Sequence, residues 1–255
     1  MNGVPDYRVV IPARYESQRL PGKALLDVAG KPLLQHVWER AIESTAKEVV
    51  IATDHERISS TASDFGAIVV MTSNEHTSGS DRIAECAETM NWAETQIIVN
   101  LQGDEPLMPA QCLEQVARLL DTDSDADAAS LYWPIEAEEE LGDPNVVKVV
   151  VSQQGDALMF SRSPIPFPRD FSSFSEARNN GIQWLRHLGL YAYRVSSLNR
   201  FAQTRPTPLE QSEHLEQLRY LETGRRIVMA RACERIPAGV DTHDDLERVQ
   251  KIISP

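Results

Sequence analysis

The stretch RVVIPARYESQRLPGK (residues 8–23) opens on a short β-branched run and continues into a loop that carries three positive charges. Such a run predicts a buried strand. Three further runs of this kind follow it, and most of the segments between them place apolar residues at helical spacing. This alternation predicts an α/β fold, with a mainly parallel sheet and helices on both of its faces. The expected strands are residues 8–13, 48–54, 67–72 and 96–106, and the expected helices are residues 31–44, 80–91 and 109–121.

The second half of the chain is richer in strands. They are expected at residues 128–135, 146–152, 157–162 and 187–195, and two more helices at residues 213–223 and 242–253. Residues 169–183 are rich in Ser, Asn and charge, which is typical of a partly mobile surface excursion. A length of 255 residues suits one large domain. We therefore expect a single domain over residues 1–255, in which residues 134–205 form a smaller, strand-rich part.

The net charge of −13 argues against a protein that binds nucleic acid or a membrane surface. A small anion could still be bound, but only by a local cluster of positive charges. The three cysteines, Cys86, Cys112 and Cys233, are widely spaced and show neither a disulfide framework nor a zinc-binding pattern. No signal peptide or long apolar span is expected, which favours a cytoplasmic protein.

The basic loop follows a predicted strand and precedes a predicted helix. It should therefore lie at the carboxyl edge of the sheet, where open α/β folds bind their ligands. Ser17 stands where a P-loop needs its first glycine, and the dinucleotide pattern G-x-G-x-x-G is not matched. Arg14, Arg19 and Lys23 could instead face a polyphosphate. A solvated basic loop is the alternative that spacing alone leaves open.

Two aspartates are candidates for a metal site. Asp104, in NLQGDEP, ends an apolar strand and is well placed to hold Mg²⁺ against a nucleotide, although a plain turn would also explain this tripeptide. In AGVDTHDDL, Thr242 and Asp245 form a pattern close to a capping box at the start of a helix. Capping leaves Asp241 without a structural role, so it could be the second carboxylate; capping as the whole explanation stays open.

Two further motifs carry polar groups to the expected ligand-binding edge. NEHTSGSDR (residues 74–82) places small residues and Gly79 before a helix, where backbone amides could contact a nucleobase or ribose, or simply form a connection. In WLRHLGLYAYR (residues 184–194), strand alternation puts His187 and Tyr191 on one face. A lone strand histidine more often has a structural role, unless other polar groups converge on it.

Taken together and in order, the opening loop, SGSDR, QGDEP, FSR, RHLGLYAYR, LEQLR and GVDT resemble the 3-deoxy-manno-octulosonate cytidylyltransferase family, from residue 9 to about residue 249. The resemblance implies a Rossmann-like nucleotide-diphospho-sugar transferase fold whose residues 134–205 serve sugar binding and dimerisation. It also implies a cytoplasmic bacterial enzyme that uses Mg²⁺ and acts as a homodimer. The expected substrates are CTP and 3-deoxy-D-manno-octulosonate (Kdo), and CMP-Kdo would serve lipopolysaccharide assembly.

The resemblance also assigns expected roles to individual residues. Arg14, Arg19 and Lys23 resemble the triphosphate-binding positions, with Arg14, Lys23, Asp104 and Asp241 as the catalytic group and the two aspartates as Mg²⁺ ligands. The expected cytidine contacts are Ala13, Arg14, Ser78 and Gly79, and the expected Kdo contacts are Gln102, Arg162, His187, Tyr191, Glu216 and Gln217. One departure is Ser80, where many relatives have threonine; the hydroxyl is kept and only a methyl group is lost.

Two kinds of rival remain on the sequence alone. A sialic-acid cytidylyltransferase, or an enzyme that uses 8-amino-Kdo, would have the same fold. A catalytically silent nucleotide-sensing protein would keep the basic loop, but it would not need Asp104, Asp241 and a sugar pocket together.

Overall fold

The computed structural model describes residues 3–16, 20–76 and 78–254. Its centre is a nine-stranded sheet whose main path runs β11-β7-β10-β6-β1-β4-β5. Strands β6, β1, β4 and β5 are mutually parallel, β7 and β11 form a second parallel pair, and β10 is antiparallel to both of its neighbours on this path. The path comprises β1 (Tyr7–Ala13), β4 (Glu48–Thr53), β5 (Ile68–Met71), β6 (Ile97–Asn100), β7 (Ala128–Pro134), β10 (Leu185–Arg194) and β11 (Ile227–Arg231).

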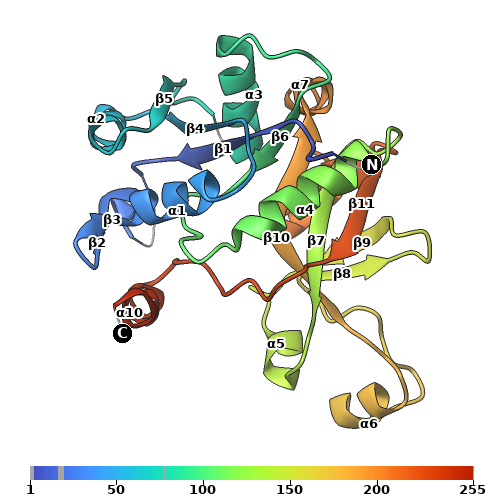
Figure 1. The fold of residues 1–255 in the computed structure, drawn as a ribbon. Helices are drawn as coiled ribbons and strands as arrows, with labels where there is room; N and C mark the ends of the chain where they lie inside the picture. Colours follow the sequence, from blue (N-terminus) through green and yellow to red (C-terminus); the bar gives the residue numbers. More distant parts are fainter. Residues whose placement is uncertain (1–2, 17–19, 77, 255) are drawn as a thin grey trace.

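Helices cover both faces of this sheet (Figure 1). One core lies between the sheet and the helices α1 (Leu33–Ile42), α2 (Glu56–Asp64) and α4 (Ala110–Asp121). The core on the other face takes side chains from α3 (Gly79–Thr89), α7 (Val195–Ala202) and α9 (Gln217–Glu222). The expected α/β architecture, with a mainly parallel sheet between two helical layers, is thereby confirmed.

Helix α4 illustrates why these segments are helical. Its buried residues recur at a spacing that places them on one side of a helix, and that side faces the sheet. They are Cys112, Leu113, Val116, Ala117 and Leu120.

Within the strand-rich part, two short strands extend the sheet beside the first residues of β10. Strand β8 (Lys148–Val151) pairs with β10 at Leu185 and Arg186, and β9 (Ala157–Ser161) pairs with β8. Below them in Figure 1, α5 (Glu138–Gly142) and α6 (Phe174–Asn179) enclose a small apolar cluster that includes Trp184. The excursion at residues 169–183 is largely exposed and contains α6, which the sequence pattern did not indicate.

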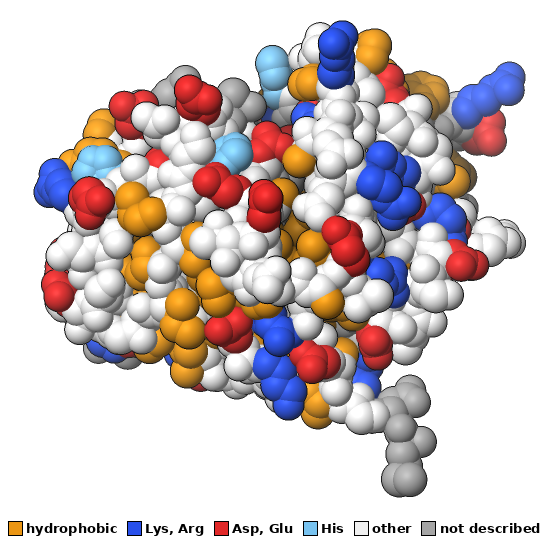
Figure 2. Space-filling view, turned by 90° about the horizontal axis from the view of Figure 1, so that it is seen from above, with side chains coloured by type: hydrophobic (Ala, Val, Ile, Leu, Met, Phe, Trp, Pro, Cys, Tyr) orange, Lys and Arg blue, Asp and Glu red, His pale blue; other side chains and the backbone are white. Residues whose placement is uncertain are grey.

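The remaining elements complete the periphery. The short helix η1 (Lys23–Leu25) follows the basic loop, and the hairpin β2 (Asp27–Val28) and β3 (Lys31–Pro32) leads into α1. Helix α10 (His243–Ile253) packs beside that hairpin and begins with the predicted capping box of Thr242 and Asp245. Acidic and basic side chains are interspersed over the face that Figure 2 shows, so the excess negative charge is not gathered there in one patch.

Several sequence expectations need correction. The single helix expected at residues 213–223 is wrong: α8 (Pro208–Glu213) ends at His214, whose φ of 51° is left-handed, and α9 starts at Gln217. Helix α2 was missed because only Ile58 and Ala62 of its residues are buried, which gives little apolar periodicity. Helix α7 and strand β11 were also missed; α7 begins directly after the last residue of β10. No helix within the described ranges is long and apolar enough to span a bilayer.

Candidate functional site

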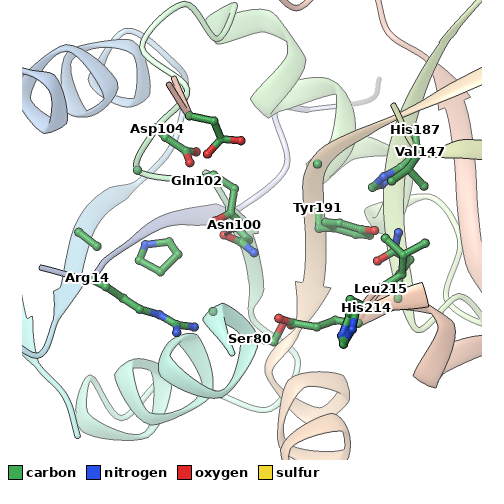
Figure 3. Close-up of a pocket in the computed structure, with 18 of the residues that line it drawn as sticks. Arg14, Ser80, Asn100, Gln102, Asp104, Val147, His187, Tyr191, His214 and Leu215 are labelled. Atoms are coloured by element: carbon green, nitrogen blue, oxygen red, sulfur yellow. Dashed lines mark hydrogen bonds between the residues drawn. The ribbon is translucent and has the colours of Figure 1, made fainter. Parts of the chain in front are cut away.

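A cleft of about 600 Å³ opens at the carboxyl ends of β1 and β6 and extends along β10 (Figure 3). The chain leaves β1 towards β4 and β5 on one side and returns to β6 on the other side. Such a reversal of strand order is where open α/β sheets bind ligands, because the loops on either side diverge and leave a crevice. Position alone therefore makes this cleft the candidate site.

Lys23, Asp104 and Asp241 meet at one end of the cleft. The Lys23 ammonium Nζ lies 2.6 Å from Asp104 Oδ2 and 3.1 Å from Asp241 Oδ1. Burial opposes the charged form of Lys23, but the two carboxylates outweigh it and hold the pKa of this lysine above its ordinary value. Residues from three distant parts of the sequence thus form one charged cluster.

Close backbone packing explains how Asp241 reaches Asp104. The amide of Val240 donates to the Asp104 carbonyl at 2.8 Å, which fastens the segment before α10 to the loop after β6. Gly239 is needed at this junction, because a Cβ there would lie 2.9 Å from the same carbonyl oxygen. The two aspartates are therefore held side by side by backbone contacts as well as by their shared lysine.

This carboxylate pair fits a hard divalent cation. Two carboxylate oxygens already surround one cationic atom, Lys23 Nζ. Mg²⁺ in proteins is typically held by one or two carboxylates, with substrate phosphates and water completing its shell. The described part of the chain offers no group of three or more His, Cys, Asp or Glu for a metal. A cation at this point would accordingly depend on Asp104, Asp241 and a bound phosphate.

The expected nucleotide positions are partly assembled along the wall beside β1. Ala13, Arg14, Lys23 and Gly79 line the cleft. Ser78 is not one of its lining residues; its side chain caps α3 by accepting a hydrogen bond from the Asp81 amide at 3.0 Å. Arg19 lies outside the described residues.

The opposite wall carries the expected sugar contacts. His187 and Tyr191 share a face of β10, with ring centroids 5.2 Å apart, and Gln102, Glu216 and Gln217 also line the cleft. Burial, with a smaller effect of Arg186, lowers the pKa of His187 to about 3, so its ring is neutral at pH 7.

Tyr191 and Glu216 add further hydrogen-bonding groups to this wall. The buried Tyr191 hydroxyl finds no hydrogen-bond partner among residues 3–16, 20–76 and 78–254. Ser80 donates to the Glu216 carboxylate at 3.0 Å and so links the two walls. Burial raises the pKa of Glu216. These side chains are suited to contact the hydroxyl groups of a polar ligand.

Arg162 is placed differently from what the resemblance implies. Its guanidinium donates to the carbonyl oxygens of Glu213 at 2.7 Å, Pro144 at 2.8 Å and His214 at 3.4 Å. It is not among the residues that line the cleft. In this conformation Arg162 supports the turn between α8 and α9 and does not itself face the cavity.

The structure adds residues that sequence reasoning missed. Asn100 lines the cleft from the last position of β6 and accepts a hydrogen bond from Gln102 at 3.3 Å; a buried asparagine ending an apolar strand is a signal that could have indicated it. His214 and Leu215 line the cleft because the chain turns sharply at His214. The neighbouring sequence gave no indication of that turn.

Comparison with known proteins agrees with the family resemblance of the sequence motifs. Residues 8–227 match the family model described as cytidylyltransferase. The chain is 50% identical to a 3-deoxy-manno-octulosonate cytidylyltransferase of Coxiella burnetii, over 96% of this chain and 98% of the relative. It is 49% identical to a protein of the same name from Actinobacillus pleuropneumoniae, over 98% of this chain and 100% of the relative.

A solved structure agrees with these relatives. CMP:2-keto-3-deoxy-manno-octonic acid synthetase complexed with CTP aligns with a TM-score of 0.89 and 40% identity, covering 98% of each chain. The similarity extends over the whole fold, including the strand-rich part.

Proposed function

The chain belongs to the 3-deoxy-manno-octulosonate cytidylyltransferase family, and on that premise we propose that it joins CTP to Kdo, giving CMP-Kdo and pyrophosphate for lipopolysaccharide assembly. One observation carries the proposal. A single cleft brings the cluster of Lys23, Asp104 and Asp241 within one cavity with the polar face of His187 and Tyr191. The first group suits a polyphosphate and the second a polyhydroxylated sugar.

In the reaction that we propose, the anomeric hydroxyl of Kdo attacks the α-phosphorus of CTP, and pyrophosphate departs in line on the opposite side. Such a transfer asks the protein mainly to position the reactants and to offset negative charge. Lys23 and Arg14 are assigned to the phosphates, Lys23 to the α-phosphate. Ala13 and Gly79 leave room for the cytidine, and Gln102, His187, Tyr191, Glu216 and Gln217 orient the sugar.

Three further sequence assignments concern Arg19, Ser78 and Arg162. Arg19 is retained as a phosphate contact. Ser78 reaches the nucleotide only through the backbone at the start of α3, since its side chain is engaged as a cap. Arg162 would have to leave its backbone partners to meet the sugar carboxylate, so we assign it to shaping the α8–α9 turn.

Asp104 and Asp241 would hold the Mg²⁺ that this reaction requires. A bound Mg²⁺ supplies charge neutralisation on the phosphates and lowers the pKa of a coordinated hydroxyl. Lys23 contacts both carboxylates in this structure. When the nucleotide binds, the Lys23 ammonium group would therefore have to turn towards a phosphate oxygen.

A panel of sugars tests the choice of substrate. Pyrophosphate release is measured with Kdo, 8-amino-Kdo and sialic acid, each combined with CTP and with UTP. The proposal expects the highest kcat/KM for Kdo with CTP. A higher kcat/KM for 8-amino-Kdo or for sialic acid would identify that sugar as the substrate and contradict the proposal. CTP binding with no pyrophosphate release in any combination would instead indicate a nucleotide sensor.

We further propose a cytoplasmic homodimer that forms through residues 134–205. Two large apolar side chains of that part are open to solvent: Leu158 is 59% exposed and Phe167 is 83% exposed. Exposed apolar groups of this size favour a protein contact. Light scattering of the wild type should give twice the 28.5 kDa of one chain, and Phe167→Glu should weaken the dimer. A monomeric wild type at micromolar concentration would contradict this assembly.

A further inference from the structure

Ser130 lies behind the sugar-facing wall and takes no part in the contacts described so far. It is a fully buried residue of β7 and stands opposite β10 where the pairing register shifts between Leu188 and Tyr191. This irregularity brings two backbone carbonyls towards one hydroxyl: Ser130 Oγ lies 3.1 Å from Leu188 O and 3.0 Å from Leu190 O. The same oxygen lies 3.1 Å from His187 Nε2.

These three distances, together with the single hydroxyl hydrogen of Ser130, indicate the direction of the hydrogen bond between Ser130 and His187. A serine hydroxyl has one hydrogen, and a carbonyl oxygen can only accept. If Ser130 donated to His187 Nε2, both carbonyl oxygens would face hydroxyl lone pairs at hydrogen-bonding distance, which is unfavourable. The hydroxyl hydrogen therefore goes to a carbonyl. Nε2 must then donate to Ser130 Oγ.

Because His187 is neutral, only one of its two ring nitrogens carries a hydrogen. Because burial lowers its pKa to about 3, the ring carries a single N–H at pH 7. If that hydrogen is on Nε2, the other nitrogen, Nδ1, is a bare acceptor. Nδ1 makes no hydrogen bond to any residue in the described part of the chain, and His187 lines the cleft (Figure 3).

We propose that Ser130 is a positioning residue that holds His187 as its Nε2–H tautomer, so that Nδ1 accepts a hydrogen bond from a sugar hydroxyl. The inference rests on the proposed function, since it specifies how that site recognises its sugar. An acceptor at this point selects a hydroxyl group and repels a carboxylate or ketone oxygen. The orientation of the acid sugar in the cleft is restricted accordingly: its carboxylate must lie away from His187.

The wild-type protein offers a direct test that requires no substitution at Ser130. Long-range ¹H–¹⁵N correlation spectra of the full-length, ¹⁵N-labelled protein at pH 7 report which ring nitrogen is protonated, and the His187 signals are identified by their loss in His187→Gln. We expect the Nε2–H tautomer. With Kdo, CTP and EDTA present, the Nδ1 resonance should shift while Nε2 stays protonated. An Nδ1–H tautomer in the wild type would overturn the proposal.

Kinetics of Ser130 variants provide a second test. Ser130→Ala should raise KM for Kdo about tenfold, the effect of losing one orienting hydrogen bond, and leave KM for CTP within twofold. In its spectrum, part of the His187 population should move to the Nδ1–H form. Ser130→Thr keeps the hydroxyl and should restore the wild-type tautomer. Equal rises in both KM values with an unchanged tautomer would reduce Ser130 to a structural role and contradict the proposal.

Ser44→Ala is the matched control. The Ser44 hydroxyl also donates to a carbonyl, that of Ala41 at 2.6 Å, but it lies at the end of α1 away from the cleft. Both KM values should remain at the wild-type level in this variant. The NMR result distinguishes a failure of the proposed function from a failure of the proposed role of Ser130. A preparation that releases no pyrophosphate would contradict the proposed function, whereas the tautomer of His187 is read without any turnover.

Discussion

At the scale of single residues, the site depends on charges that are held in place by one another. Lys23 offsets part of the negative charge of Asp104 and Asp241, which reduces the repulsion between the two carboxylates. A bound dication would take over that role and would leave the lysine available to phosphate. The cluster is thus arranged for an exchange of one cation for another.

The contribution of Asp241 can be tested by removing its charge alone. Asp241→Asn keeps the size of the side chain, and we expect kcat for pyrophosphate release to fall at least a hundredfold while the fold persists. Asp244→Asn is the matched control, since Asp244 is exposed in the first turn of the same helix. Asp241→Asn with a rate near that of Asp244→Asn would remove Asp241 from the proposed metal site.

His187 should make the stability of the protein depend on pH. Its folded pKa of about 3 lies below the ordinary value of 6.5, so the unfolded chain binds the extra proton between these values. Stability is therefore full above pH 6.5 and falls as the pH decreases towards 3. At pH 5 the loss is up to about 2 kcal/mol, since each unit corresponds to about 1.4 kcal/mol.

Urea unfolding at pH 7.5 and 5.0 checks this expectation. The decrease in unfolding free energy between the two pH values should be smaller in His187→Asn than in the wild type. His243→Asn, which changes an exposed histidine, should behave like the wild type. An identical decrease in all three proteins would show that His187 titrates normally.

At the scale of elements, short tertiary contacts place the catalytic loops. Residues 239–241 are fastened to the loop after β6 by the Val240 amide. On the sugar side, α9 is anchored by the buried pair of Arg219 and Glu210, 2.5 Å apart, with the Arg219 guanidinium stacked 4.0 Å from the Phe201 ring. Each wall of the cleft is thus held by contacts between segments that are distant in the sequence.

Gly239→Ala tests the junction that brings Asp241 to Asp104. The added Cβ would meet the Asp104 carbonyl at 2.9 Å, so the backbone must shift. A displacement of about 1 Å at a catalytic group can cost about a hundredfold in rate, and we expect kcat to fall by that order. Gly142→Ala, where a Cβ meets nothing within 4 Å, should keep the wild-type rate. Equal rates in the two variants would contradict the proposed role of this junction.

At the scale of the whole molecule, the sequence predicts the parts that local patterns control. Strands buried on both faces appear as β-branched runs, and their carboxyl ends share one edge, so Asp104 and the basic loop could be placed near each other. The left-handed His214, which divides the expected helix at residues 213–223, depends on tertiary packing and has no local signal. The same holds for Arg162, whose partners lie on separate loops, and for the contact of Ser130 with His187 across two strands.

In the candidate site, too, local patterns could be predicted and tertiary contacts could not. Most of the residues that the motifs indicated do line the cleft, but many other lining residues were not indicated. Strand alternation predicted the shared face of His187 and Tyr191, but the direction of other side chains could not be predicted, since it depends on neighbours that are remote in the sequence. Arg162 illustrates this limit, because its guanidinium donates to the carbonyl oxygens of Pro144 and Glu213 on other segments.

The most direct test of the central claim is the dependence of pyrophosphate release on both substrates at once. Initial rates are measured for the purified full chain with CTP and Mg²⁺ while the Kdo concentration is varied. We predict saturable release that matches CMP-Kdo formed one to one and stops when either substrate or Mg²⁺ is omitted. Saturable binding of CTP with no Kdo-dependent release of pyrophosphate would contradict the account.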